Sequence, residues 1–342
     1  MLGLRNLVVG ALALAVSALP AMSQELKTVR FGTPNLNLPY LPIYVADVMG
    51  HFEANGIRAE FETFKQGGAT AMAALIGGNI DIFPGSVSSA LRAYEEGTGV
   101  VIAGALVTQY TSVVAARGAF LEERGIAIDA PLEKKLEALK GANIGVTSPG
   151  SGTDQIAQFL IKKSGLTPRD VNLVYVGGDS AIVSAFALDR VDLIVTSSPT
   201  IDKLIAEHNG KLLFNTAAAE IPELDGFPYI TINTTHRFIE SDRARAVATI
   251  KALADAEASL KDPAKVDDIR KAVHQKYFAN FDEALFAAAW NSVIDAYPAN
   301  PAISDEQIDL AIGFLNEFSK EKFGEAAREA FDREIVAEAI AD

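Results

Sequence analysis

Short apolar stretches alternate with turn-forming residues along most of the chain, and their apolar residues recur with two spacings. Alternate apolar positions indicate strands, whereas apolar positions three and four apart indicate amphipathic helices. The first part of the chain is predicted to contain strands at 28–32, 57–64 and 80–83, and helices at 41–54, 68–76 and 87–96. This repeated strand–helix order predicts an open α/β sheet with helices on its faces.

A second block with the same layout follows Gly118. Its predicted strands are 141–146, 171–176 and 191–195, and its predicted helices are 131–139, 154–163 and 180–188. A last strand is expected at 229–233, before a helical C-terminal stretch with breaks near 262–263 and 298–301. Two similar blocks in a chain of this length predict two lobes, because the chain exceeds one ordinary core.

The N-terminus has the pattern of a secretory signal peptide. Arg5 is the only charged residue before Glu25, an apolar run extends from Leu7 to Leu19, and the small residues Ala21-Met22-Ser23 follow it. A retained membrane anchor is the alternative, but it needs about 20 apolar residues and this run is shorter. We expect residues 1–23 to be a signal peptide that is cleaved after Ser23, with no membrane insertion of the mature protein.

Composition narrows the classes of partner. The chain has 30 Lys and Arg against 44 Asp and Glu, a net charge of -14. Nucleic acids and anionic lipids bind basic surfaces, so an acidic protein is not expected to have a nucleic-acid partner. The sequence contains no cysteine. This excludes disulfides, thiolate metal sites and a lipid anchor on an N-terminal cysteine. The protein is therefore expected to be either free in a periplasm or secreted outright, and we favour the periplasm.

Ligands of open α/β sheets bind beyond the carboxyl ends of the strands, where the helix N-termini also gather. The turns at those positions are rich in Ser, Thr, Asn, Gln and Gly, for example 34–37, 66–68, 85–88, 148–153, 177–179 and 197–199. Backbone N–H groups and short hydroxyls of this kind suit a polar or anionic group. For Ser151 and Thr153, the alternative is that they only cap a helix.

Two acidic residues and two aromatic residues extend this set of candidates. Asp154 and Asp179 are placed to accept hydrogen bonds from an amine or a heterocyclic N–H, or else to complement the dipole of a helix. Tyr40 and Tyr110 are candidates for stacking on a flat ligand.

No motif indicates catalysis, a metal or a cofactor. Gly150-x-Gly152 lacks the third glycine of a dinucleotide-binding fingerprint. The four histidines are scattered, with no pair at metal-ligand spacing. We therefore expect no catalytic residue, no metal and no cofactor.

Several stretches together resemble one family. They are Lys65-Gln66-Gly67-Gly68-Ala69, residues 75–81, residues 139–146, Gly150-Ser151-Gly152-Thr153 and residues 165–171. This set is similar to the sulfonate, taurine and thiamine-precursor binding proteins of ABC importers, a family shared with the yeast thiamine-pyrimidine synthase. The resemblance spans about half of the chain, from Phe31 to Pro199.

The resemblance implies the type II periplasmic binding protein fold, an α/β fold of two lobes joined by a two-segment hinge. Lobe one would comprise residues 25–115 plus 226–342 and lobe two residues 116–225, with hinges near 109–116 and Phe227. The ligand-binding residues expected from the resemblance and from the turns are Asn35, Leu36, Tyr40, Gln66, Gly67, Ser86, Val87, Ser88, Tyr110, Ser148, Gly152, Thr153, Asp154, Asp179 and Ser198.

The function expected is the periplasmic solute-binding component of an ABC importer, which closes on a small organic ligand and delivers it to the permease. No Arg or Lys lies squarely in the turns, so a sulfonate, a carboxylate and a nitrogen heterocycle all stay open as ligands. The alternatives are a pyrimidine-synthase-like enzyme of the same fold and a ligand-sensing partner of a membrane receptor. We expect a monomer.

Overall fold

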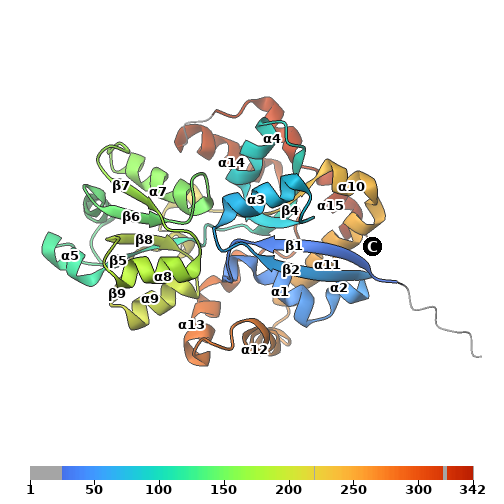
Figure 1. Ribbon diagram of the computed structural model, residues 1–342, viewed down its shortest axis with the longest axis horizontal. Helices are drawn as coiled ribbons and strands as arrows, with labels where there is room; N and C mark the ends of the chain where they lie inside the picture. Colours follow the sequence, from blue (N-terminus) through green and yellow to red (C-terminus); the bar gives the residue numbers. More distant parts are fainter. Residues whose placement is uncertain (1–24, 219, 319–321, 342) are drawn as a thin grey trace, which may run out of the picture.

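A computed structural model describes residues 25–218, 220–318 and 322–341. The predicted signal peptide, residues 1–23, lies outside the described residues. The described chain forms two lobes with helices packed on their sheets (Figure 1). Lobe one contains a two-stranded and a three-stranded sheet, and lobe two contains one five-stranded sheet. Lobe two is the part drawn mainly in green, and lobe one contains the blue, cyan and orange-to-red parts of the chain.

The strands of lobe one come from both ends of the described chain. They are β1 (Lys27–Thr33), β2 (Ile57–Thr63), β3 (Phe83–Ser86), β4 (Val100–Val107) and β10 (Ile230–Thr235). β1 and β2 are parallel, whereas β10 lies between β3 and β4 and is antiparallel to both. A parallel bridge between Phe31 and Ile82 joins the two groups of strands.

Lobe two contains one five-stranded sheet of order β7-β6-β8-β5-β9. Its strands are β5 (Val113–Arg117), β6 (Asn143–Val146), β7 (Asn172–Tyr175), β8 (Leu193–Thr196) and β9 (Gly210–Phe214). β5 is antiparallel to β8 and β9, and β6 is parallel to β7 and β8. β5 is the first strand after the chain crosses into lobe two, and β10 is the first after it returns to lobe one. Each of these two strands is antiparallel to both of its neighbours in the sheet.

The crossings are residues 108–112, between β4 and β5, and residues 215–229, between β9 and β10. The lobe boundaries expected from the sequence, 25–115 plus 226–342 and 116–225, fall in or beside these crossings, and we keep them as a proposal. Among the helices of the described residues, none is both long enough and apolar enough to cross a membrane.

The α-helices cover both sheets and form most of the C-terminal part of lobe one (Figure 1). They are α1 (Leu41–Val48), α2 (His51–Ala54), α3 (Gly68–Gly77), α4 (Val87–Glu95), α5 (Gly118–Arg124), α6 (Leu132–Leu136), α7 (Gly152–Lys163), α8 (Asp179–Ala187), α9 (Thr200–Glu207), α10 (His236–Ser241), α11 (Arg243–Leu260), α12 (Val266–Tyr277), α13 (Glu283–Val293), α14 (Asp305–Phe318) and α15 (Arg333–Ile340).

Two predicted elements of the first block differ from the structure. The helix expected over 41–54 is interrupted at Gly50, which has a φ of 71° and separates α1 from α2. The strand expected at 80–83 is shifted to Phe83–Ser86, because these residues pair with Ile230–Asn233 of β10. Pro84 is compatible with a strand here because β3 lies at the edge of the β3-β10-β4 group, where one side needs no ladder N–H.

One buried acid interrupts the apolar packing of lobe one. Glu257 of α11 is fully buried, and neither of its carboxyl oxygens has a hydrogen-bond partner among the described residues. Burial raises its pKa well above the usual glutamate value, and the nearby Lys261 lowers the pKa only in part. The folded protein therefore holds a proton on Glu257 at a pH where the unfolded chain has released it.

We predict that Glu257→Gln stabilises the protein by an amount that grows with pH. Because the pKa of Glu257 is higher in the folded state, the free energy of unfolding of the wild type falls as the pH rises above about 4.3, the unfolded value. Glutamine does not titrate. Thermal denaturation between about pH 5 and pH 8 should show a widening gap in Tm, whereas Glu53→Gln, an exposed control, should show none. A gap that is the same at every pH contradicts the prediction.

Candidate functional site

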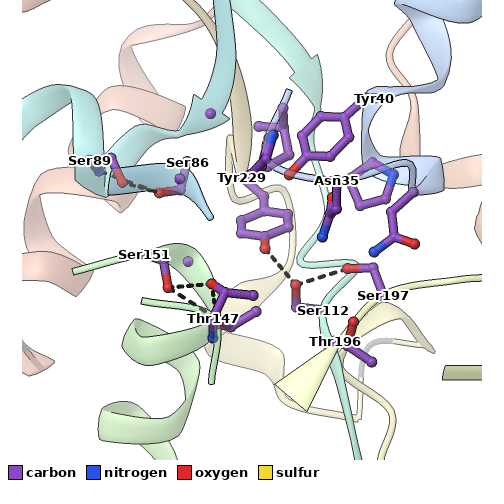
Figure 2. A pocket seen from close by; sticks show the side chains of 18 of the residues that line it. Asn35, Tyr40, Ser86, Ser89, Ser112, Thr147, Ser151, Thr196, Ser197 and Tyr229 are labelled. Atoms are coloured by element: carbon purple, nitrogen blue, oxygen red, sulfur yellow. Dashed lines mark hydrogen bonds between the residues drawn. The ribbon is translucent and has the colours of Figure 1, made fainter. Parts of the chain in front are cut away.

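A polar pocket lies between the two lobes, beyond the carboxyl ends of several strands (Figure 2). Its lining is dominated by side chains with a hydroxyl or an amide group. These are Asn35, Asn37, Tyr40, Ser86, Ser89, Ser112, Thr147, Ser151, Thr153, Thr196, Ser197 and Tyr229. Within the described residues, none of the side chains lining the pocket carries a charge.

The pocket is small and closed. The pocket has a volume of only about 40 Å³. Its polar side chains other than Ser89 are each at most 9% exposed. A ligand of this pocket would therefore be small and almost completely enclosed, and its polar groups would need partners from the protein.

Three helices begin at the pocket. Gly68 is the first residue of α3, Ser86 caps α4 by accepting from the Ser89 N–H at 3.4 Å, and Ser151 caps α7 by accepting from the Asp154 N–H at 3.3 Å. The first N–H groups of a helix have no acceptor within it, and they carry the positive end of its dipole. α3 and α4 belong to lobe one and α7 to lobe two, so both lobes direct positive partial charge into the pocket.

Hydroxyl groups hold the loop before α7 in place. The Thr147 N–H donates to Thr153 Oγ1 at 2.9 Å, and the Thr147 hydroxyl donates to Ser151 Oγ at 2.9 Å (Figure 2). Asp154 Oδ2 accepts from the Gly150 N–H at 2.8 Å. Ser151 thus both caps the helix and lines the pocket, so the two interpretations of this residue are compatible.

One tyrosine from each crossing lies at the base of the pocket, Tyr229 in the lining and Tyr110 behind it. Tyr110 stacks on Tyr229 with ring centroids 4.0 Å apart, and its hydroxyl donates to the Gly152 carbonyl at 2.5 Å. The Tyr229 hydroxyl lies 2.5 Å from Ser112 Oγ, which lies 3.0 Å from Ser197 Oγ. Burial raises the pKa of Tyr229 to about 12, although the hydrogen bond with Ser112 lowers it. Tyr229 therefore keeps its proton at neutral pH.

Hydrogen bonds between the lobes close the pocket on two sides. On one side, the Leu38 N–H donates to the Ser198 carbonyl at 2.8 Å, and the Leu36 N–H donates to Asp179 Oδ2 at 3.2 Å. On the other side, Arg92 Nη1 donates to the Gly150 carbonyl at 2.8 Å, and the Ser89 hydroxyl donates to the same carbonyl at 3.3 Å. The structure is thus the closed arrangement of the two lobes.

Of the residues predicted from the sequence, the structure places Asn35, Tyr40, Ser86, Gly152 and Thr153 in the lining of the pocket. The other predicted residues lie outside that lining. Val87 and Ser88 are buried in the first turn of α4, behind Ser86, and Gln66 is exposed. Tyr110 lies behind Tyr229.

The remaining predicted residues lie where the lobes meet. Ser148 faces Gly67 across the lobes, where a Cβ added to Gly67 would lie 3.5 Å from Ser148 Oγ. Ser198 and Asp179 make the bonds to Leu38 and Leu36 described above. Asp154 supports the loop before α7. As ligand contacts, the residues expected from the sequence stay predictions.

Sequence reasoning missed several lining residues, above all Tyr229, Ser112, Thr196 and Ser197. Tyr229 comes two residues after Phe227, where a hinge was expected, and hinge segments pass between the lobes. Thr196 and Ser197 precede Ser198 in a turn that was considered, but which residues of a turn face inward depends on its conformation. Two buried acceptors of the lining, Asn35 Oδ1 and Thr196 Oγ1, have no partner in the described structure, so they are free to meet a ligand.

The described residues contain no group of three or more His, Asp or Glu side chains that could hold a metal ion.

Residues 23–274 match the model of the NMT1-like family. The chain belongs to that family. No curated protein matches it. Among solved structures, a protein of Bordetella bronchiseptica RB50 has a TM-score of 0.78 and 24% identity, with coverage of 91% of this chain and 96% of the other. These similarities show the periplasmic binding protein fold, as predicted from the sequence.

Three further structural relatives of this NMT1-like protein have functions in their names. The alkanesulfonate-binding protein SsuA from Xanthomonas axonopodis pv. citri, bound to MOPS, has a TM-score of 0.67 and 19% identity over 91% of this chain and 97% of its own. The periplasmic nitrate-binding protein NrtA from Synechocystis PCC 6803 has a TM-score of 0.71 and 13% identity, with 92% and 88% covered. The desulfurization enzyme DSZB shares the fold at a TM-score of 0.62 and 13% identity, with 92% and 98% covered.

Closure of the pocket requires a glycine at position 152. A Cβ added there would lie 2.6 Å from Tyr229 Cε2 and 2.8 Å from its hydroxyl oxygen, whereas a Cβ on Gly68 would meet nothing nearer than Phe83 Cζ at 3.6 Å. We predict that Gly152→Ala destabilises the closed state by about 1–3 kcal/mol, or roughly 5- to 150-fold in ligand affinity. Calorimetry should show a much smaller loss for the control Gly313→Ala, at a position of α14 where an added Cβ meets nothing within 4 Å. Equal losses in the two variants contradict the prediction.

Proposed function

We propose that this NMT1-like protein is the solute-binding component of an ABC importer, and that it captures a small oxyanion, such as a short sulfonate or carboxylate. The observation that carries the proposal is the meeting of the N-termini of α3, α4 and α7, from both lobes, at one closed and uncharged pocket. Fixed N–H dipoles of this kind stabilise an anion without a cationic side chain.

The hydroxyl groups of the pocket support the same ligand class. Tyr40 and Tyr229 are buried, and burial raises the pKa of both phenols above the usual tyrosine value, so each retains a proton to donate. Serine and threonine hydroxyls can rotate to donate as well. A nitrogen heterocycle would need more acceptors, and the buried Asn35 Oδ1 is one such acceptor. The phenol donors and the three helix N-termini favour the oxyanion, and the unpaired Asn35 Oδ1 can accept from one donor of the ligand.

The relatives support a binding role for the fold. The sulfonate-binding and nitrate-binding relatives are named for anions, and the nitrate-binding one is named as periplasmic. We propose the same compartment for this protein, with residues 1–23 as its signal peptide, an ABC permease as its partner and a monomeric state. Ligand binding would favour the closed state, because only that state contacts the ligand from both lobes.

A thermal-shift series tests the ligand class. The probes are methanesulfonate, taurine, nitrate, acetate, benzoate and a pyrimidine, added to the mature protein. A ligand at 100 times its Kd adds about 2.7 kcal/mol to the free energy of unfolding, so we expect a rise in Tm of several degrees for at least one oxyanion. The Gly152→Ala variant should lose that rise. A rise with the pyrimidine alone, or with none of the probes, contradicts the proposed ligand class.

A mass spectrum of the purified protein tests the enzyme alternative. A synthase of this fold that uses pyridoxal phosphate would carry the cofactor on a lysine, and the protein would be heavier by the mass of that group. We expect the mass of the unmodified mature chain. An added cofactor mass that borohydride reduction fixes in place would contradict the transport proposal.

A further inference from the structure

A second cavity lies immediately outside the polar pocket. Its volume is about 350 Å³, against about 40 Å³ for the polar pocket. Its walls are largely apolar and include Leu36 of lobe one, Val183 of α8 and Phe281, which precedes α13. Lys203 of α9 lies in its lining as well, with its ammonium 6.0 Å from the ring centre of Phe281.

The wall between the two cavities consists of a few hydrogen-bonded side chains. Asn37 lines the inner pocket, whereas Asp179 and Thr200 line the outer cavity. Asn37 Nδ2 donates to Asp179 Oδ1 at 3.1 Å, and the Thr200 hydroxyl lies 2.9 Å from Asn37 Oδ1 and 3.0 Å from Asp179 Oδ1. The Leu36 N–H donates to the other carboxyl oxygen of Asp179.

Asp179 accepts most of the hydrogen bonds by which this wall joins the lobes, and Thr200 adds one bond to Asn37. Asp179 is the first residue of α8 in lobe two, and it accepts hydrogen bonds from Leu36 and Asn37 of lobe one. Thr200, at the start of α9, belongs to lobe two like Asp179. The wall is therefore complete only when the lobes are closed, and its main connection is the Asp179 carboxyl group.

We propose that Asp179 is a specificity-determining residue that limits the length of the ligand, because it separates the inner pocket for the polar head from an apolar cavity that would otherwise hold an alkyl tail. This inference rests on the proposed oxyanion-binding function. On the other side of the pocket, the bonds of Arg92 and Ser89 to Gly150 close the second exit. In the closed wild type, hydrogen bonds between the lobes therefore obstruct a long tail on both of these sides.

Removal of the Asp179 side chain would reduce the wall to the Asn37–Thr200 hydrogen bond and open space beside it between the two cavities. An alkyl tail could then pass from the inner pocket to Leu36, Val183 and Phe281, where each buried methylene group raises affinity roughly fourfold. The same removal weakens closure for every ligand, since the bonds to Leu36 and Asn37 are lost. The discriminating quantity is therefore the ratio of affinities for long and short ligands, not either affinity alone.

Calorimetry with methanesulfonate, butanesulfonate and octanesulfonate tests this proposal. We expect wild type to bind methanesulfonate more tightly than octanesulfonate, and Asp179→Ala to change the octane-to-methane affinity ratio at least about tenfold in favour of the long chain. Asp179→Asn retains the volume of the wall, so its ratio should stay within about threefold of wild type even if all affinities move together. An unchanged ratio in Asp179→Ala overturns the proposal.

Two further variants test where the alkyl tail of octanesulfonate lies in Asp179→Ala. Asp179→Ala combined with Val183→Asp puts a charge in the outer cavity, and it should lose the gain for octanesulfonate while leaving methanesulfonate binding near that of Asp179→Ala. Ser180→Ala, which alters only the outer cavity, should behave as wild type. Retention of the octanesulfonate gain in the double variant would mean that the tail lies elsewhere, which overturns the proposed route.

Hydrogen exchange separates a failure of this proposal from a failure of the proposed function. If methanesulfonate does not bind wild type, the oxyanion function fails, but the wall can still be measured. The Leu36 amide should exchange at least about tenfold faster in Asp179→Ala than in wild type or Asp179→Asn, because its acceptor is gone. Equal exchange of the Leu36 amide in all three proteins overturns the role of Asp179 in the wall.

Discussion

The stacked pair Tyr110–Tyr229 holds together the two chain crossings on which the pocket is built. Each ring comes from a different crossing, and each hydroxyl makes a further bond, one to the Gly152 carbonyl and one to Ser112. Aromatic stacking contributes about 0.5–1.5 kcal/mol beyond the area that it buries. Because the Gly152 backbone lies directly against Tyr229, the start of α7 is positioned by this pair, and the anion-binding end of that helix is positioned with it.

The two sides of the pocket differ in how they close. Near Arg92, a guanidinium and a hydroxyl share one carbonyl oxygen of a glycine whose φ of 73° favours glycine over other residues. Near Asp179, a carboxyl group gathers donors from both lobes, and burial raises its pKa from the usual aspartate value while those hydrogen bonds lower it. Arg92 and Asp179 thus lie beside the pocket but outside its lining. A ligand in the pocket would therefore face only neutral side chains and helix dipoles.

The strand–helix order and the turn positions could be read from the sequence because they depend on local patterns. The family followed from short stretches such as Gly150-Ser151-Gly152-Thr153. β4 was not predicted, since its eight residues are all buried and apolar and show no alternation. The displacement of β3 depends on pairing with β10, and the choice of Tyr229, Thr196 and Ser197 as lining residues depends on how the lobes meet. Such contacts join residues far apart in the sequence, where local patterns carry no information.

The position of β10 bears on how the protein folds. It is the central strand between β3 and β4, and its Thr231 bonds to the carbonyl of Gly85, 146 residues away in the sequence. The strands of lobe two, in contrast, all lie between Val113 and Phe214, within one continuous part of the chain. Loops of such length slow the pairing of strands. Lobe two can therefore form its sheet first. The edges of β3 and β4 stay unpaired and exposed until β10 pairs with both strands.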